Sequence, residues 1–251
     1  MDKIKTILIS QPQPRDEKNH YHELAERNNL KIDFRPFIHV EGVPVKEIRK
    51  ERINILDHTA VILTSRNAVD HFFRVCKEMR VNVPDSMKYF CVSQSVANYL
   101  QKYIVYRKRK IFYGEKTFDS LMTQIKKNSK EKFFVPLSDM HNNKIPDTLT
   151  KHKIKFTKSV FYKTVCSDLS DLKDVFYDVL VFFSPTGIKS LFANFPDFKQ
   201  NSTKIATFGA NTLKAAEAAG LRVDIAAPNP ESPSMVMALE KYIREYNKGK
   251  K

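Results

Sequence analysis

The sequence predicts an α/β protein of two lobes. Each lobe is built on a parallel sheet, and a two-stranded β-ladder joins the two lobes. Short β-branched or aromatic runs alternate along the chain with longer amphipathic stretches, and this alternation favours parallel sheets with helices on both faces. A weak internal duplication divides these elements into two similar sets. The length of 251 residues is enough for two small domains.

The predicted strands are short runs rich in β-branched and aromatic residues. They cover residues 6–10, 32–37, 60–64, 89–92, 133–137, 156–163, 179–183, 205–208 and 223–227. Amphipathic patterns between most of these runs predict helices, for example over residues 67–78 and 211–219.

The duplication consists of three pairs of similar segments in the same order and at similar spacing. They are residues 60–73 with 179–192, 88–97 with 204–213, and 117–125 with 232–240. In the first pair, a buried strand leads to a serine, Ser65 or Ser184, and then to a helix with apolar periodicity. Each half of the chain therefore repeats one supersecondary pattern.

One strand of each half falls outside this order, and it sets the domain boundaries. In the first half it comes late, at residues 132–137, and the remaining equivalent is the N-terminal run at residues 5–10. We therefore expect one discontinuous lobe of residues 1–36 plus 164–251, and one continuous lobe of residues 37–163. The crossing segments, residues 32–37 and 156–164, would pair as the ladder, and ligands commonly bind in a cleft between two such lobes.

The charge of the chain points to an anionic ligand. Lys and Arg number 43 against 28 Asp and Glu, which gives a formal charge of +15. Such an excess attracts nucleic acid, phosphates or a substrate with many carboxylates, and charge does not choose among them. The basic runs at residues 106–110 and 247–251 are interpreted as solvated surface.

Other bulk features favour a cytoplasmic protein. No apolar run approaches the ~18–20 residues needed to cross a bilayer, and the N-terminal residues lack a cleavage pattern. The cysteines, Cys76, Cys91 and Cys166, have no CxxC spacing and sit in apolar stretches, which is typical of buried reduced thiols. His20 and His22 form an HxH pair without nearby Cys or carboxylate clusters, so no metal site is expected.

The positive signal for a site comes from the strand-to-helix turns. Glycine-rich phosphate loops and the common hydrolase and metalloprotease motifs are absent from the sequence. Instead, Thr64 and Ser65 follow one strand, and Ser184 with Pro185 follows its counterpart, where they suit the cap and first position of a helix. Such turns present backbone N–H groups and a positive helix end, so several at matching places favour an anion-binding site.

The motifs in these turns resemble those of the uroporphyrinogen-III synthase family. The carriers are VFFSPTG at residues 181–187, FGANT at 208–212, LTSRNAV at 63–69 and VFYKT at 160–164, followed by weaker similarity over residues 214–223 and 228–233. The resemblance spans nearly the whole chain, and its evidence is the ordered set of motifs. It implies two Rossmann-like (flavodoxin-like) lobes joined by a two-stranded β-ladder.

The resemblance also implies the activity and the site. Enzymes of this family are lyases that cyclise linear hydroxymethylbilane to uroporphyrinogen III, with inversion of ring D and loss of water, in haem, sirohaem and cobalamin biosynthesis. No cofactor is implied, and Tyr162 matches the tyrosine that is assigned as proton donor. The implied substrate-binding residues are Thr64, Ser65, Asn67, Ser93, Ser95, Ser184, Pro185, Thr186, Asn211 and Thr212.

The chain departs from the family pattern in two turns. The first strand is followed by Ser10, without the arginine that often stands there, and Arg15 comes further on. The turn expected as G-x-x-T-A reads SQSVA at residues 93–97, so Ser93 or Ser95 would substitute. Lys189 and Lys214, early in their helices, are expected to add long-range attraction.

Two other functions are open at this point. One is a protein of the same fold that binds an acidic tetrapyrrole or another polyanion without turning it over. The other, ranked lower, is a basic nucleic-acid-binding protein, against which stands the lack of an RNP-type or helix-turn-helix pattern. The expected partner is the small polycarboxylate substrate alone, with no nucleic acid, no membrane and a monomeric state.

Overall fold

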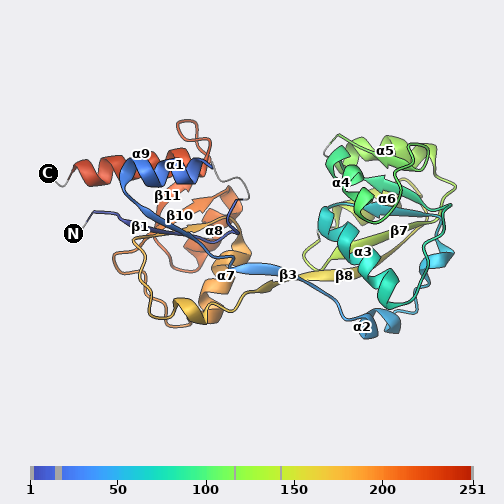
Figure 1. Cartoon of the computed structure of the whole chain (residues 1–251), viewed down its shortest axis with the longest axis horizontal. Helices are drawn as coiled ribbons and strands as arrows, with labels where there is room; N and C mark the ends of the chain where they lie inside the picture. The colour runs from blue at the N-terminus through green and yellow to red at the C-terminus, as the bar shows by residue number, and fades with distance from the viewer. Residues whose placement is uncertain (1–2, 15–18, 116, 142, 250–251) are drawn as a thin grey trace. The chain divides into compact units, whose positions relative to one another are not determined.

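The computed structural model describes residues 3–14, 19–115, 117–141 and 143–249. The chain divides into two compact units, a terminal unit of Met1–His39 with Val165–Lys251 and a central unit of Val40–Thr164. It passes between the units through β3 (Ile38–Gly42) and β8 (Phe156–Cys166), which are adjacent strands (Figure 1). None of the described helices has the length and apolar character that crossing a membrane requires.

The central unit is a sheet in the order β3-β8-β7-β4-β5-β6 with helices on both faces. Its further strands are β4 (Ala60–Leu63), β5 (Lys88–Cys91), β6 (Ile111–Tyr113) and β7 (Phe133–Ser138). Its helices are α2 (Val45–Lys50), α3 (Arg66–Glu78), α4 (Gln94–Tyr99), α5 (Phe118–Lys127) and α6 (Lys144–Lys151), with 3₁₀ turns at Ile55–Asp57 and Leu100–Lys102. Helices α2, α3 and α4 cover one face, and α5 and α6 cover the other.

The terminal unit repeats this design with the order β11-β10-β9-β1-β2. Its strands are β1 (Thr6–Ile9), β2 (Lys31–Phe34), β9 (Val179–Phe182), β10 (Lys204–Phe208) and β11 (Val223–Ala227). Its helices are α1 (His20–Asn28), α7 (Pro185–Asn194), α8 (Ala210–Ala218) and α9 (Met235–Lys248), with a 3₁₀ turn at Ser170–Leu172. Helices α1 and α9 cover one face, and α7 and α8 cover the other.

The central strands are apolar on both faces because helices cover both faces of each sheet. Every residue of β4 and of β9 is buried, as is typical of parallel strands inside a doubly covered sheet. All pairings given among β4 to β8, and among β1, β2 and β9 to β11, are parallel. The predicted fold class is confirmed.

The strand orders also explain why the duplication is split in the sequence. When the two sheets are aligned on β4 and β9, β7 of the central unit corresponds to β1 of the terminal unit. The strand that comes late in one half is therefore supplied by the N-terminus in the other, as the repeat predicts. The two units share one topology with different chain connections.

The predicted ladder segment at residues 32–37 is wrong. Strand β2 ends at Phe34 and pairs in parallel with β1 inside the terminal sheet, from Thr6 opposite Lys31 to Ile9 opposite Phe34. The partner of β8 is instead β3, a strand that we did not predict. Pro36 separates β2 from β3, because proline has no N–H to continue a hydrogen-bonded strand.

Candidate functional site

The site of the central unit lies where parallel strands end and helices begin. Strands β7, β4 and β5 are neighbours, so the turns that follow them meet along one edge of the sheet. Thr64 and Ser65 follow β4, Ser93 follows β5, and Asp139 follows β7. This edge therefore gathers hydroxyl groups and helix starts from separate parts of the sequence.

Ser65 connects the start of α3 with Tyr162. Its Oγ accepts a hydrogen bond from the backbone N–H of Ala68 at 3.1 Å, which caps the helix. The same Oγ lies 3.4 Å from the hydroxyl of Tyr162. Since the cap already uses Ser65 as an acceptor, its own hydrogen is free to be donated to the tyrosine oxygen.

The strand segment around Tyr162 is bound to the turn that follows β7. It lies on β8 opposite Ser138, where the register of β7 and β8 shifts. The N–H of Asp139 donates to the carbonyl of Tyr162 at 3.1 Å, and the N–H of Thr164 donates to Asp139 Oδ1 at 3.1 Å. Only 7% of Tyr162 is exposed, so its ring is packed in place among the side chains at this edge of the sheet.

Two residues of α3 that we did not predict pack beside Tyr162. The ring of His71 stacks on Tyr162 with centroids 5.1 Å apart and planes 14° from parallel. Arg74 donates from Nε to His71 Nδ1 at 3.2 Å, and its Nη2 donates to the carbonyls of Val43 at 2.9 Å and Phe161 at 3.2 Å. Arg74 therefore ties α3 to the strand that carries Tyr162.

These contacts also indicate which ring nitrogen of His71 carries the hydrogen. An arginine only donates, so Nδ1 of His71 is an acceptor and Nε2 carries the hydrogen. Burial, and then the Arg74 guanidinium, lower the pKa of His71 below its ordinary value, against an opposing effect of Asp70. The ring that supports Tyr162 is thus a neutral imidazole at physiological pH.

The other predicted residues of this unit lie at the same edge, in the turns and helix starts that follow β4 and β5. Ser93 caps α4 by accepting from Val96 N–H at 3.4 Å, and its Oγ lies 3.0 Å from that of Ser95. Asn67 is exposed in the first turn of α3, and Thr64 is half-buried before it. The structure gives no contact between the Ser93–Ser95 pair and Tyr162.

The terminal unit has a matching edge. Ser184 caps α7 by accepting from Gly187 N–H at 3.1 Å, with Pro185 at the first helical position. Ser10 directly follows the neighbouring strand β1, and its N–H donates to the carbonyl of Val181 at 3.0 Å. A Cβ added at Gly187 would lie 3.6 Å from Ser184 Oγ and 3.8 Å from Ser10 Oγ, so both hydroxyls border the same turn. Thr186 is half-buried beside them.

The start of α8 differs, because no side chain caps it. Its N-cap is Gly209, at a φ of 90° that a residue with a side chain rarely adopts. Asn211 is exposed in the first turn, whereas Thr212 is 2% exposed and lies in the wall beneath. This helix start keeps its first backbone N–H groups open to an external acceptor.

Some sequence expectations fall elsewhere. Arg15 lies outside the described residues. Lys189 and Lys214 are exposed in α7 and α8, where they can attract an anion at long range. His20 and His22 are near Glu23 and Glu26 on α1, and the described residues hold no group of three or more His, Cys, Asp or Glu side chains suited to a metal ion.

Comparisons with known proteins give one matching family model and several solved structures of the same fold. A model of the family described as "Uroporphyrinogen-III synthase HemD" matches residues 19–237, and no curated protein matches the chain. The crystal structure of uroporphyrinogen-III synthetase from Helicobacter pylori is similar with a TM-score of 0.59 at 16% identity, covering 96% of this chain and 100% of that one. A mutant uroporphyrinogen III synthase from Thermus thermophilus is similar with a TM-score of 0.52 at 14% identity, covering 96% and 99%. At these low identities, the similarity shows that this chain and the two crystal structures share one fold.

Proposed function

Because the chain belongs to the uroporphyrinogen-III synthase family, we propose that Tyr162, together with helix starts in each of the two units, acts on hydroxymethylbilane. The activity of the chain is that of a lyase, which closes this linear tetrapyrrole to uroporphyrinogen III with inversion of ring D and loss of water. The observation that carries the assignment of the site is the 3.4 Å approach of Ser65 Oγ to the hydroxyl of Tyr162 at the start of α3.

This reaction requires mainly that the enzyme bind the substrate and hold it in the right orientation. The substrate bears eight carboxylates, and its electron-rich pyrroles drive loss of the terminal hydroxyl to give an azafulvene. The last ring then attacks through its substituted carbon, and a spiro intermediate resolves with that ring inverted. A protein accelerates such a step by holding the two ends in a near-attack arrangement.

We assign the grip to helix starts and hydroxyl groups. The uncapped start of α8, with Asn211 beside it, offers N–H donors and a positive helix end to a carboxylate. Ser65 and Ser184 occupy equivalent caps in the two units and add hydroxyl groups. The formal charge of +15 favours encounter with a polycarboxylate.

We assign the departure of the hydroxyl group to Tyr162. A phenol can donate a proton to the leaving oxygen, and general acid catalysis of this kind contributes about 10²–10⁴-fold. The hydrogen bond available from Ser65 would stabilise the tyrosine oxygen as its proton leaves. Stacking on His71 and the backbone contacts of β8 hold the ring in one orientation.

Product analysis tests the function and the residue separately. Incubation of the purified chain with hydroxymethylbilane is expected to give uroporphyrinogen III, and a yield of isomer I at the spontaneous rate alone would reject the enzymatic activity. Binding without ring closure would instead support the binding-protein alternative. Tyr162→Phe is expected to lose at least about 100-fold in turnover, and an unchanged rate would remove the proposed role.

We further propose that the enzyme works in the cytoplasm as a monomer without a cofactor. The unpaired cysteines, of which Cys76 and Cys91 are buried and Cys166 is exposed, are compatible with a reducing compartment. Sedimentation velocity of the purified chain, with and without substrate, measures the oligomeric state directly.

A further inference from the structure

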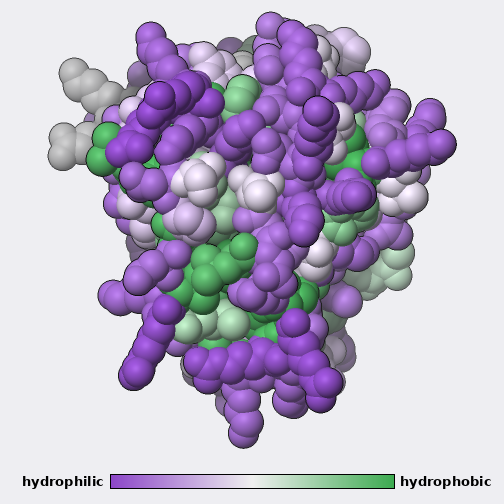
Figure 2. All heavy atoms as spheres, turned by 90° about the vertical axis from the view of Figure 1, so that its right-hand side faces the viewer, coloured by the Kyte–Doolittle hydropathy of each residue, from purple (hydrophilic) through white to green (hydrophobic). Residues whose placement is uncertain are grey.

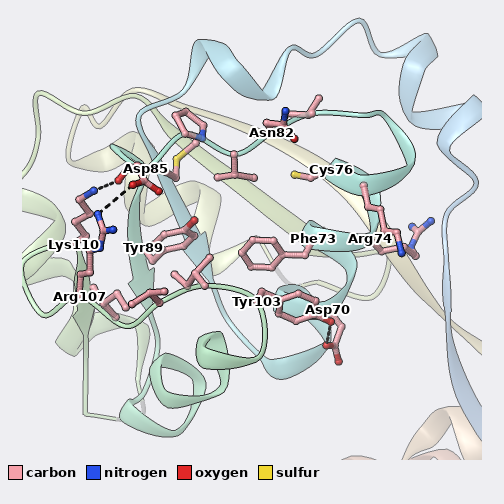
Figure 3. A pocket seen from close by; sticks show the side chains of 18 residues that line it. Asp70, Phe73, Arg74, Cys76, Asn82, Asp85, Tyr89, Tyr103, Arg107 and Lys110 are labelled. Atoms are coloured by element: carbon pink, nitrogen blue, oxygen red, sulfur yellow. Dashed lines mark hydrogen bonds and ion pairs between the residues drawn. The ribbon is translucent and has the colours of Figure 1, made fainter.

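One cavity of the central unit has no part in the proposed reaction. It has a volume of about 770 Å³ and lies between α3, the loop before β5 and the segment that leads to β6 (Figure 3). Cavities of roughly 300–1,000 Å³ are typical of small-molecule sites. Its size is therefore suited to a ligand of one or two rings.

Aromatic side chains form one wall of this cavity. Phe73 stacks on Tyr103 with centroids 4.5 Å apart and planes 7° from parallel, and on its other side it lies 6.3 Å from Tyr89. Figure 3 shows Phe73 and Tyr89 side by side against the open space. Val105 is 78% exposed at the rim, so apolar surface reaches solvent there. On the face that Figure 2 views, apolar groups lie between largely hydrophilic side chains.

One polar group in the wall has no partner. Tyr89 is 4% exposed, and among the residues that the structure describes none hydrogen-bonds its hydroxyl. In Figure 3 the hydroxyl points into the cavity between Asp85 and Phe73. Burial raises the pKa of Tyr89, so the group is a neutral hydroxyl that a polar atom of a ligand can satisfy.

The charges around the cavity favour an anion. Basic side chains outnumber acidic ones in the lining, and both acidic groups are already bonded. Asp70 accepts from Tyr99 at 2.9 Å and from Lys102 at 2.9 Å, and Asp85 pairs with Arg107 at 3.3 Å. The side chain of Asp85 is 88% exposed and that of Arg107 is 43% exposed, so their ion pair is weak. The guanidinium of Arg107 can therefore donate to the carboxylate of a ligand instead.

We propose that this cavity binds an aromatic carboxylate. Its ring system lies against Phe73 and Tyr89, its carboxylate pairs with Arg107, and the Tyr89 hydroxyl donates a hydrogen bond to it. Planar carboxylate recognition by a guanidinium is bidentate and charge-assisted. The site is separate from Tyr162, although Arg74 lines the cavity and also contacts His71.

Titration of the ¹⁵N-labelled full chain with 1-naphthoate tests this proposal. We expect saturable shifts on α3, β5 and the segment around Arg107, with a Kd of roughly 0.1–1 mM, as for other ligands of this size. The neutral analogue 1-naphthalenemethanol is expected to bind at least about fivefold more weakly, because it cannot pair with the guanidinium. Equal affinity for the two probes, or no saturable shift, overturns the proposal.

Matched variants separate the site from general basic charge. Arg107→Gln removes the paired cation, whereas Arg109→Gln removes an exposed cation of the same run that does not line the cavity. We expect about a fivefold or greater loss of affinity in the first and no change in the second, and about a threefold to tenfold loss in Tyr89→Phe. Equal losses in Arg107→Gln and Arg109→Gln contradict the site. Because binding is read without turnover, the result does not depend on the role of Tyr162.

Discussion

The imidazole of His71 lies almost parallel to the ring of Tyr162, with centroids 5.1 Å apart. The two residues come from α3 and β8, and a third residue, Arg74, contacts both elements. The orientation of Tyr162 therefore depends on the packing of α3 against its strand. This relationship makes His71 a positioning residue for the proposed proton donor.

Removal of the stacked ring is expected to lower turnover without removing the donor. Aromatic stacking contributes about 0.5–1.5 kcal/mol, so His71→Ala should reduce kcat roughly twofold to tenfold if the ordering of Tyr162 is lost. His71→Phe keeps a ring and should retain most of the activity. Steady-state kinetics of both variants, with product isomers identified, is the measurement. A kcat that falls equally in both variants would point to a chemical role for the imidazole instead.

A methyl group at Gly42 is expected to disturb the same network from a distance. A Cβ at this position would lie 2.6 Å from Cζ of Arg74, so the guanidinium must move. We expect Gly42→Ala to weaken the bond from Arg74 to His71 Nδ1, to lower kcat severalfold and to leave most of the folding stability intact.

The ¹⁵N shifts of the His71 ring report this effect directly. They should indicate an Nε2–H tautomer in the parent chain and a mixture of tautomers in Gly42→Ala. Val40→Ala, an exposed position on the same strand, is the control and should change neither the tautomer nor kcat. An unchanged His71 spectrum in Gly42→Ala would show that Arg74 does not set the tautomer.

The strand pattern and the serine caps could be predicted because they depend on local sequence. The apolar runs predicted at residues 60–64 and 179–183 contain the fully buried strands β4 and β9, each one residue shorter than predicted, and Ser65 and Ser184 cap the helices that follow. These features need only neighbours in the chain. The repeat also indicated that the strand near the N-terminus is the counterpart of the late strand of the first half, and β1 and β7 do occupy equivalent places in the two sheets.

The missed features depend on contacts between distant segments. His71 and Arg74 read as ordinary polar positions of an amphipathic helix, and only their approach to Tyr162 and Phe161 gives them a role. Strand β6 has three residues and follows a basic run, so its pattern was too short to recognise. Strand β3 has three consecutive exposed residues at its centre and no apolar run to mark it. The site assignments made from motifs stay predictions.

The buried thiols are expected to make folding stability fall at alkaline pH. Burial raises the pKa of Cys76 and of Cys91 to about 12, from an ordinary value of 9.0. The unfolded chain therefore releases protons that the folded chain keeps, so stability is complete below about pH 9 and declines as pH rises towards 12. Each thiol contributes up to about 1.4 kcal/mol per pH unit within that window.

Urea unfolding at pH 8 and pH 10 measures the decline. Cys166→Ala changes an exposed thiol and should leave the pH dependence intact, whereas Cys91→Ala should reduce it. In the native chain at pH 8, a thiol reagent should modify one cysteine quickly and all three only after unfolding. Rapid modification of Cys76 or Cys91 in the folded chain would contradict the assigned burial.

The caps of α7 and α9 separate substrate binding from helix stability. Ser184 accepts from Gly187 N–H at 3.1 Å, and Ser234 accepts from Met237 N–H at 3.3 Å, so each serine makes the same local bond in the terminal unit. Replacement of either by alanine should cost about 1 kcal/mol of stability. Ser184→Ala alone should raise the KM for hydroxymethylbilane, by about threefold to tenfold, because its hydroxyl is also proposed to contact a substrate carboxylate. Equal KM values in the two variants, at matched folded fractions, would mean that Ser184 only caps its helix. Substrate binding in the terminal unit would then be assigned to the start of α8.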